Sequence, residues 1–265
     1  MRYCRRCNRE TEKLFCSECG ALTYPLPSKN VKPELEEGFE WKKASEQMEG
    51  MINDKNLKVN EKAARLESYI RSLSDFQIAE TVDGNYDHMG ALIIDAMLQS
   101  GINYETVVRP RVLSLLKQYP KAKTTSGFLE LVEKVGINEL IHWKDDEKPR
   151  RILSVARFLN EKGIETEAEL HQWLQNPDNI KELKKLRGIG DKTADYFKIL
   201  VGIQTNAVDR HLLAFLKAAN VSVHNYKEAH QVINRAAALM HIDPIYFDHS
   251  IWKYMSTKKI KPCER

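Results

Sequence analysis

The chain has 265 residues, of which 42% are hydrophobic and 29% are charged, and its formal net charge is +4. These proportions are typical of a globular protein with one good-sized core, or one core and a small appendage. No run approaches the roughly 18 apolar residues of a membrane span, and the N-terminus MRYCRRCNRE lacks the apolar segment of a signal peptide. We therefore expect no membrane association and a reducing, cytoplasmic location.

Two cysteine pairs, Cys4-x2-Cys7 and Cys16-x2-Cys19, lie within residues 1–23. In a reducing compartment, closely spaced cysteines indicate a metal-binding site rather than disulfide bonds. Two such pairs complete a tetrahedral set of four thiolates suited to zinc, and nothing else in so short a segment would fold it. The sequence predicts a zinc ribbon, which is structural because a closed site leaves no position for a substrate.

Residues 24–57 are predicted to be a linker, because prolines stiffen its start and glutamates make it acidic. From about Leu57 onward the apolar spacing is helical and β-branched alternation is scarce. We expect an all-α domain of about ten helices. Outside the central motif, helices are predicted over 63–70, 89–97, 106–119, 127–135, 151–159, 226–240 and 245–254.

Basic residues gather in three places, which is the footprint that a polyanionic partner needs, although any one cluster is more often a solvated face. They lie at the N-terminus, before the central motif and at the C-terminus: Arg2, Arg5, Arg6 and Arg9; Lys181, Lys184, Lys185 and Arg187; Lys258, Lys259 and Lys261.

The segment 179–216 predicts a helix, a very tight turn and a second helix, followed by a third. An apolar stripe at helical spacing ends at Gly188-Ile189-Gly190, where two glycines permit close backbone approaches. Asp191 is predicted to cap the second helix. The free N–H groups of such a turn and helix start form a natural seat for a phosphate oxygen.

Lys192 stands in the first turn of that second helix, where a cation opposes the helix dipole at a cost of ~0.3–1 kcal/mol. A positive helix end also lowers the pKa of the amine, which makes Lys192 a candidate nucleophile. The alternative is a solvated lysine paired with Asp191 or Asp195. Further on, Asp209 precedes the third helix and is predicted to be its N-cap, worth about 1 kcal/mol.

Taken in order, LRGIGDKTADYF and AVDRH resemble the helix-hairpin-helix and Gly/Pro–Asp (HhH-GPD) signature of the DNA glycosylase superfamily that includes endonuclease III. The resemblance covers roughly residues 60–257. It implies a two-lobed helical domain over 58–257, followed by a basic tail at 258–265. It also implies that Lys192 attacks C1′ of a damaged nucleotide beside Asp209. The hairpin would bind the DNA backbone through Lys185, Arg187, Gly188, Ile189 and Gly190, with Arg187 replacing the usual proline.

Two features depart from that family. Many members fill the gap left by a flipped base with a glutamine after an apolar helix, but the comparable place here holds Gly101. Gln99 and Asn103 are the candidates for that role. The alternative interpretation is that they only cap a helix C-terminus and form hydrogen bonds within the loop. Endonuclease III also ends in four cysteines that hold an iron–sulfur cluster. This chain has Cys263 alone there, so we expect no cluster.

The resemblance predicts a base-excision repair DNA N-glycosylase with AP lyase activity. It would act as a monomer on double-stranded DNA that contains a damaged or modified base, in the nucleoid or in a nucleus. Two alternatives stay open: a non-catalytic DNA-binding repair factor, and a monofunctional glycosylase that activates water through Asp209. The zinc ribbon would contact DNA or dock a protein partner, and the identity of the excised base is not defined.

Overall fold

The computed structural model describes residues 2–4, 9–11, 24–25 and 58–258 and divides the chain into two compact units, 1–52 and 53–265. In the first unit, strands β1 (Arg2–Cys4), β2 (Arg9–Thr11) and β3 (Tyr24–Pro25) form an antiparallel sheet in the order β2-β1-β3. Cys7, Cys16 and Cys19 lie outside the described residues, as do most of the predicted linker and the tail after Lys258. The zinc ribbon therefore stays a prediction.

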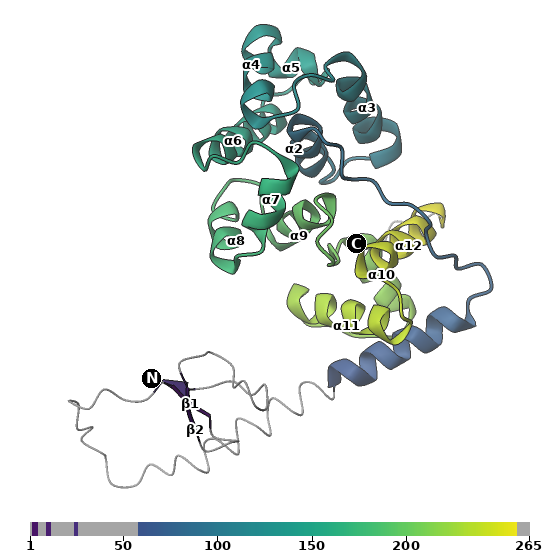
Figure 1. Ribbon diagram of the computed structural model, residues 1–265. Coiled ribbons are helices and arrows are strands. Elements are labelled where there is room, and N and C mark those ends of the chain that lie inside the picture. The colour runs from purple at the N-terminus through teal and green to yellow at the C-terminus, as the bar shows by residue number, and fades with distance from the viewer. Residues whose placement is uncertain (1, 5–8, 12–23, 26–57, 259–265) are drawn as a thin grey trace. The chain divides into compact units, whose positions relative to one another are not determined.

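The second unit confirms the all-α class, since its described secondary structure is helical throughout (Figure 1). None of the described helices is both long and apolar enough to span a membrane. Besides helical residues 58–72, its elements are α2 (Met89–Leu98), η1 (Tyr104–Val108), α3 (Arg109–Gln118), α4 (Thr125–Val135), α5 (Ile137–Leu140), α6 (Glu147–Glu161), α7 (Glu167–Leu174), α8 (Pro177–Leu183), α9 (Asp191–Leu200), α10 (Arg210–Ala218), α11 (Tyr226–Leu239) and α12 (Pro244–Thr257).

One predicted helix, over residues 106–119, differs from the structure at its start. The helical backbone begins earlier, with a π-helical turn, η1, that continues directly into α3. The side chain of Asn103 sets this start, because its Oδ1 accepts hydrogen bonds from the Thr106 N–H at 2.9 Å and the Thr106 hydroxyl at 2.8 Å. A capping side chain of this kind satisfies an N–H group that the first helical turn leaves unpaired.

Two hydrophobic cores organise the helices of this unit. The first is built by α2 to α9 around α2, in which every residue is buried. The second joins helix 58–72, drawn blue in Figure 1, to the C-terminal helices α10, α11 and α12. Within this unit the backbone therefore starts in the second core with helix 58–72, builds the first core, and returns to the second after α9. Ile199, Ala207 and Ile245 form a small apolar cluster where the chain returns.

The close packing of α2 explains its glycine. A Cβ at Gly90 would lie 2.4 Å from Cδ2 of Phe128 on α4, a separation that real Cβ atoms do not show. The absent side chain lets α2 approach α4 and bury its apolar residues against the rest of the first core.

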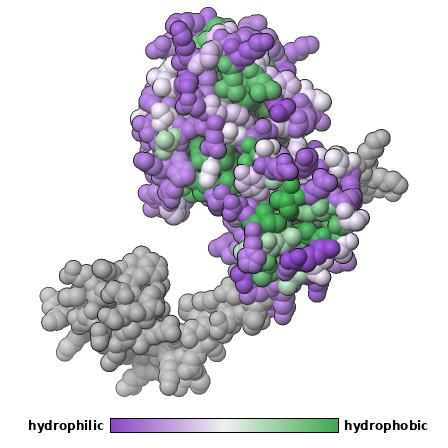
Figure 2. Space-filling model, turned by 45° about the vertical axis from the view of Figure 1, so that its right-hand side comes forward, coloured by the Kyte–Doolittle hydropathy of each residue, from purple (hydrophilic) through white to green (hydrophobic). Residues whose placement is uncertain are grey.

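The described surface is mainly hydrophilic on the face drawn in Figure 2, where hydrophobic areas are separate from one another. Among the described residues, exposed large apolar side chains include Ile78, Leu113 and Leu213. Single exposed apolar side chains are ordinary for a globular surface, and we assign them no role.

Candidate active site

The central motif is a helix, a short turn and a second helix, as predicted from the sequence. After α8, the N–H of Leu186 donates to the Leu183 carbonyl at 3.1 Å and the N–H of Ile189 donates to the Leu186 carbonyl at 3.1 Å. Ile189 is only 5% exposed and belongs to the first core. Its side chain therefore anchors the turn from inside, and only its backbone is placed to meet a ligand.

The two glycines of the turn serve different needs. Gly188 has φ +92°, and a Cβ there would lie 2.8 Å from Cδ of Arg151 on α6. The fold itself therefore requires this glycine. Gly190 has φ −97°, which any residue adopts, and a Cβ there would meet no atom within 4 Å. Gly190 leaves open space at the start of α9 that the fold does not need.

The predicted cap of α9 is wrong by one residue. Gly190, not Asp191, is the N-cap, and no side chain accepts a hydrogen bond from the first turn. Asp191 is the first residue of the helix, and its carboxylate accepts from the amine of Lys184 instead. Because helix-starting N–H groups have no partner within the helix, those of α9 are free to bind an anion in the space beside Gly190.

Acidic neighbours pair with much of the positive charge beside this turn. Lys181 pairs with Asp178 at 2.8 Å, and Lys184 pairs with Asp191. Arg187 lies 3.0 Å from the carboxylate of Glu147 on α6. Lys185 is exposed, and among the described residues no ion pair involves it. Of the predicted DNA contacts, Lys185 is therefore the cation most available to a phosphate.

Lys192 is the second residue of α9 and is partly buried. Its Nζ donates to Oε1 of Gln99, the C-cap residue of α2, and lies 5.2 Å from the ring centroid of Tyr196. Burial lowers the pKa of Lys192, against the opposing charges of Asp209, Asp248 and Asp95. Desolvation, rather than the helix end considered from the sequence, is thus the main cause of the shift.

The alternative partners of Lys192 are occupied elsewhere. Asp191 accepts from Lys184, and Asp195 accepts from Lys198 at 2.8 Å and from the hydroxyl of Tyr226 at 2.7 Å. Lys192 is therefore not the solvated lysine of a surface ion pair.

The prediction that Asp209 caps the third helix is confirmed. Its Oδ1 accepts from the N–H groups of His211 at 2.8 Å and Leu212 at 3.0 Å, and its Oδ2 lies 2.9 Å from Nδ1 of His211. Burial acts to raise the pKa of Asp209, but these hydrogen bonds and the charges of His211 and Lys192 outweigh it and lower the pKa below its ordinary value. The carboxylate is therefore charged, and its field reaches Lys192.

A second carboxylate, Asp248 on α12, belongs to the same group. Its Oδ2 accepts from the N–H of Ala207 at 2.7 Å, two residues before Asp209. The residue keeps a small accessible surface, yet protein atoms crowd its carboxylate, and this burial raises the pKa of Asp248 to about 7, with the charge of Asp209 adding to the rise. The sequence analysis did not identify this residue.

A third carboxylate, Asp95 on α2, is fully buried and also escaped the sequence analysis. Burial raises the pKa of Asp95 to about 6, although tyrosine hydroxyls oppose the rise. Those hydroxyls belong to Tyr86 at 2.5 Å, Tyr196 at 3.2 Å and Tyr104 at 3.4 Å. A signal was present in the sequence: one acid within the apolar run ALIIDAML must be buried with that run and needs donors.

We expect the titration of Asp248 to appear in the pH dependence of stability. The pKa of Asp248 is higher in the folded chain than its ordinary value of 3.8. The contribution of Asp248 to folding stability is therefore fully present below about pH 4 and is lost as the pH rises to about 7. Asp248→Asn keeps the acceptor for Ala207 and removes the titration. It should stabilise the protein at pH 8 by up to about 4 kcal/mol and have little effect at pH 4, measured by chemical denaturation. Equal effects at both pH values would contradict the shifted pKa. The pH dependence of stability that comes from the raised pKa of Asp95 should remain in this variant.

The two candidates for filling the base gap are placed differently. Asn103 is exposed and caps η1, whereas Gln99 lies against the amine of Lys192. The structure thus brings Gln99, Lys192, Asp209, Asp248 and Asp95 together from α2, α9, α10 and α12.

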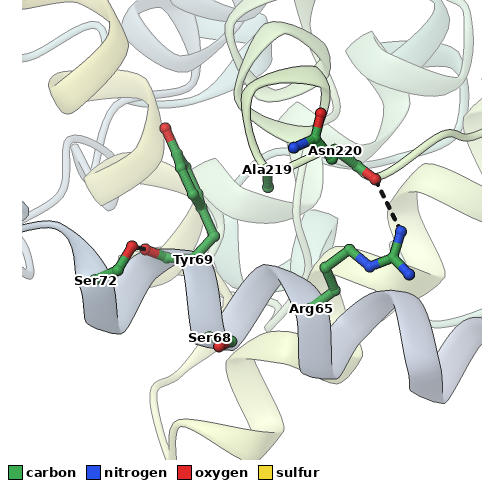
Figure 3. A pocket seen from close by; sticks show the side chains of 6 residues that line it. All are labelled: Arg65, Ser68, Tyr69, Ser72, Ala219 and Asn220. Carbon is green, nitrogen blue, oxygen red and sulfur yellow. Dashed lines mark hydrogen bonds between the residues drawn. The ribbon is translucent and has the colours of Figure 1, made fainter.

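A shallow pocket of about 490 Å³ lies elsewhere, on the second core (Figure 3). Helix 58–72 forms one wall, and the turn after α10 forms the other, where Arg65 donates to the carbonyl of Asn220 at 3.2 Å. The hydroxyls of Ser68, Tyr69 and Ser72 line the pocket, but no carboxylate or histidine that could act as a base lines it, and we assign no chemistry to it. Among the described residues no group of three or more His, Cys, Asp or Glu side chains is arranged to hold a metal ion.

The fold and this site define a protein whose second unit is all-helical and in which two helices joined by a tight turn carry a desolvated lysine among carboxylates. The chain belongs to the family described as Domain of unknown function (DUF8548), which matches residues 64–256. The matched span includes α2 to α11 and contains Gln99, Lys192, Asp209 and Asp248. No curated protein and no solved structure matches the chain.

Proposed function

We propose that the protein is a base-excision repair DNA N-glycosylase with AP lyase activity, in which Lys192 is the nucleophile. The observation that carries this proposal is the environment of Lys192. Its amine is desolvated, its pKa is lowered, and its acceptor is an amide rather than a carboxylate. A lysine held in this way has a larger fraction of free amine near neutral pH, which a covalent catalyst needs.

The proposed arrangement of DNA follows from the two cores and the turn between α8 and α9. In this proposal the two cores would be the two lobes that the HhH-GPD resemblance implies, and α8, the turn and α9 would be its helix-hairpin-helix. A phosphate would bind in the open space beside Gly190, at the start of α9. The damaged nucleotide, flipped out of the duplex, would then enter between the lobes and present C1′ to Lys192.

The proposed chemistry proceeds in two stages. The free amine of Lys192 forms a bond to C1′ as the bond from C1′ to the base breaks. The new ammonium then loses a proton, and its nitrogen forms a double bond to C1′ as the bond from C1′ to O4′ breaks, so the sugar ring opens and O4′ takes up a proton. The resulting protonated Schiff base makes the C2′ proton acidic. Loss of that proton and of the 3′ phosphate oxygen then cleaves the strand by β-elimination. The charged Asp209, whose field reaches Lys192, would stabilise the positive charge that develops on the sugar.

The test of this function is cleavage by the wild-type protein. Duplexes with one abasic site, or one uracil, hypoxanthine, thymine glycol, dihydrouracil or 8-oxoguanine, would be incubated with it and the products resolved on denaturing gels. We expect an unsaturated sugar at the 3′ end of the cleaved abasic strand and release of at least one base. A protein that binds all duplexes and cleaves none would favour the non-catalytic DNA-binding alternative.

A pair of substitutions at Gly190 tests whether the start of α9 binds a phosphate. Asp and Asn are equally good N-cap residues, and a Cβ meets no atom there, so neither Gly190→Asp nor Gly190→Asn should lower stability. Asp adds a negative charge where the phosphate would bind. We expect Gly190→Asp to weaken binding to damaged and undamaged duplexes alike by at least about tenfold more than Gly190→Asn, measured by fluorescence anisotropy. Equal affinities would place the phosphate elsewhere.

We also propose that Cys4, Cys7, Cys16 and Cys19 bind one structural zinc ion and that this ribbon contacts DNA or a protein partner. Purified protein should contain one zinc per chain by elemental analysis, and Cys16→Ser with Cys19→Ser should remove it. The helical unit should keep its melting temperature in that variant. Full zinc content after both substitutions would contradict the assignment.

A further inference from the structure

The amide of Gln99 has one satisfied end and one unsatisfied end. Its Oε1 accepts from Lys192, while its Nε2 is buried and has no hydrogen-bond partner. Among the described residues the other two such buried atoms, Asn206 Oδ1 and Asn234 Oδ1, are both acceptors. A buried donor without a partner destabilises the folded state, so its presence next to a candidate nucleophile calls for a functional explanation.

The orientation of this amide follows from its neighbour. A charged lysine amine donates and cannot accept, so the oxygen of Gln99 must face Lys192 and the NH2 group must face away. When the amine is neutral, donating one N–H to this oxygen leaves its lone pair free for attack. Gln99 thus holds Lys192 in a reactive orientation and carries a spare donor beside it.

The backbone of Gln99 is held in place by a second lysine. Nζ of Lys148 on α6 donates to the carbonyls of Met97 at 3.1 Å, Leu98 at 3.0 Å and Ser100 at 2.9 Å. The first two carbonyls belong to the C-terminal end of α2, where helical carbonyls lack partners, and Ser100 directly follows the C-cap residue Gln99. The three hydrogen bonds fix the residues on both sides of Gln99, so its spare donor is preorganised rather than mobile.

The position of this donor relative to a substrate follows from the proposed attack. Lys192 must reach C1′, and both polar atoms of the Gln99 amide are attached to one carbon, so Nε2 lies close to the glycosidic bond. In pyrimidines the acceptor O2 is bonded to the ring carbon next to the glycosidic nitrogen. In purines the acceptor N3 is bonded to the corresponding ring carbon. Either acceptor would face the spare donor when C1′ faces Lys192.

We propose that Nε2 of Gln99 donates a hydrogen bond to O2 or N3 of the departing base and so stabilises the charge that develops on it. This inference rests on the proposed glycosylase function. As the bond from Lys192 to C1′ forms, the bond from C1′ to the base breaks and its electron pair passes into the base ring. The new secondary ammonium loses one proton and the base gains one, so charge balances. Gln99 is then a catalytic residue for base release and a positioning residue for strand cleavage.

The experiment separates these two steps. Gln99→Met keeps the length of the side chain and removes its polar atoms. Single-turnover rates would be measured for release of the base that the wild-type protein excises fastest from the panel above, and for cleavage of a duplex with a preformed abasic site. We expect base release to fall about 100-fold, as for loss of one preorganised donor. Cleavage at the abasic site, where no base departs, should fall less than about tenfold.

Gln99→Glu provides a second, nearly isosteric variant. Its carboxylate still accepts from Lys192 but has no donor, and its charge raises the pKa of the amine. Cleavage of the abasic duplex should therefore be slow at neutral pH and recover as the pH rises, while base release stays low at every pH. Gln175 is a matched control, because it is the C-cap of α7 as Gln99 is of α2. Gln175→Met should leave both rates unchanged.

The outcomes distinguish this inference from the function on which it rests. Equal losses of both rates in Gln99→Met would mean that Gln99 only orients Lys192, and unchanged rates would remove any role for it. Either result overturns the inference and leaves the proposed function intact. Wild-type protein that neither cleaves the abasic duplex nor releases any base of the panel would overturn the proposed function, and this inference with it.

Discussion

Lys192→Met should abolish cleavage of a duplex that contains an abasic site, with a loss of at least about 10³-fold in the single-turnover rate. Methionine has a similar length and fills the partly buried space beside Tyr196, so the fold should be kept. DNA binding should stay within a few-fold of wild type, because in the proposed arrangement the phosphate contacts come from the turn and not from this side chain. Gel-resolved cleavage and anisotropy measure the two properties separately.

Lys162→Met is the control for the loss of a lysine, since Lys162 is the C-cap of α6 and pairs with Glu182. It should cleave abasic DNA at the wild-type rate. Cleavage that persists in Lys192→Met would assign the nucleophile to another amine. A loss of binding as large as the loss of cleavage would mean that Lys192 contacts DNA without forming a bond to it.

The second large effect is expected at Asp209, where Asp209→Asn removes the charge and keeps the cap. Asparagine is as good an N-cap residue as aspartate, so its carbonyl oxygen can still accept from the N–H groups of His211 and Leu212. Base release should slow by about 10²–10³-fold, because one electrostatic stabiliser of the sugar cation is lost. The melting temperature should change little, and single-turnover kinetics with thermal unfolding measure both.

Asp209→Ser provides the check, since serine also caps helices well and carries no charge. Its rate should match that of Asp209→Asn. If both variants melt at lower temperature and release bases at the wild-type rate, Asp209 is only a helix cap.

The sequence predicted the helical class and the elements whose signal is local. The apolar run of α2 predicted a buried helix, and the whole of α2 is buried. The cap at Asp209 was predictable because the carboxylate bonds to N–H groups only two and three residues away. The cap at Asp191 was predicted wrongly, since the backbone enters the helix one residue earlier and Lys184 engages the carboxylate.

The candidate site was less predictable because distant helices build it. Asp95 comes from α2, which shares the first core with α9, and Asp248 comes from α12 of the second core. Only tertiary packing brings their charges to Lys192. Their raised pKa values follow from burial, which the apolar run around Asp95 signals in the sequence but which nothing near Asp248 does. The partnership of Gln99 and Lys192 spans 93 residues, so the sequence could name both residues but could not pair them.

Borohydride trapping tests the identity of the nucleophile most directly. Wild-type protein would be incubated with a duplex containing one abasic site in the presence of sodium borohydride, which reduces a Schiff base to a stable bond. We expect a covalent protein–DNA adduct, located at Lys192 by peptide mapping and absent from Lys192→Met. No adduct with the wild-type protein, or an adduct of equal yield on the N-terminal amine in both proteins, would contradict the assignment of Lys192.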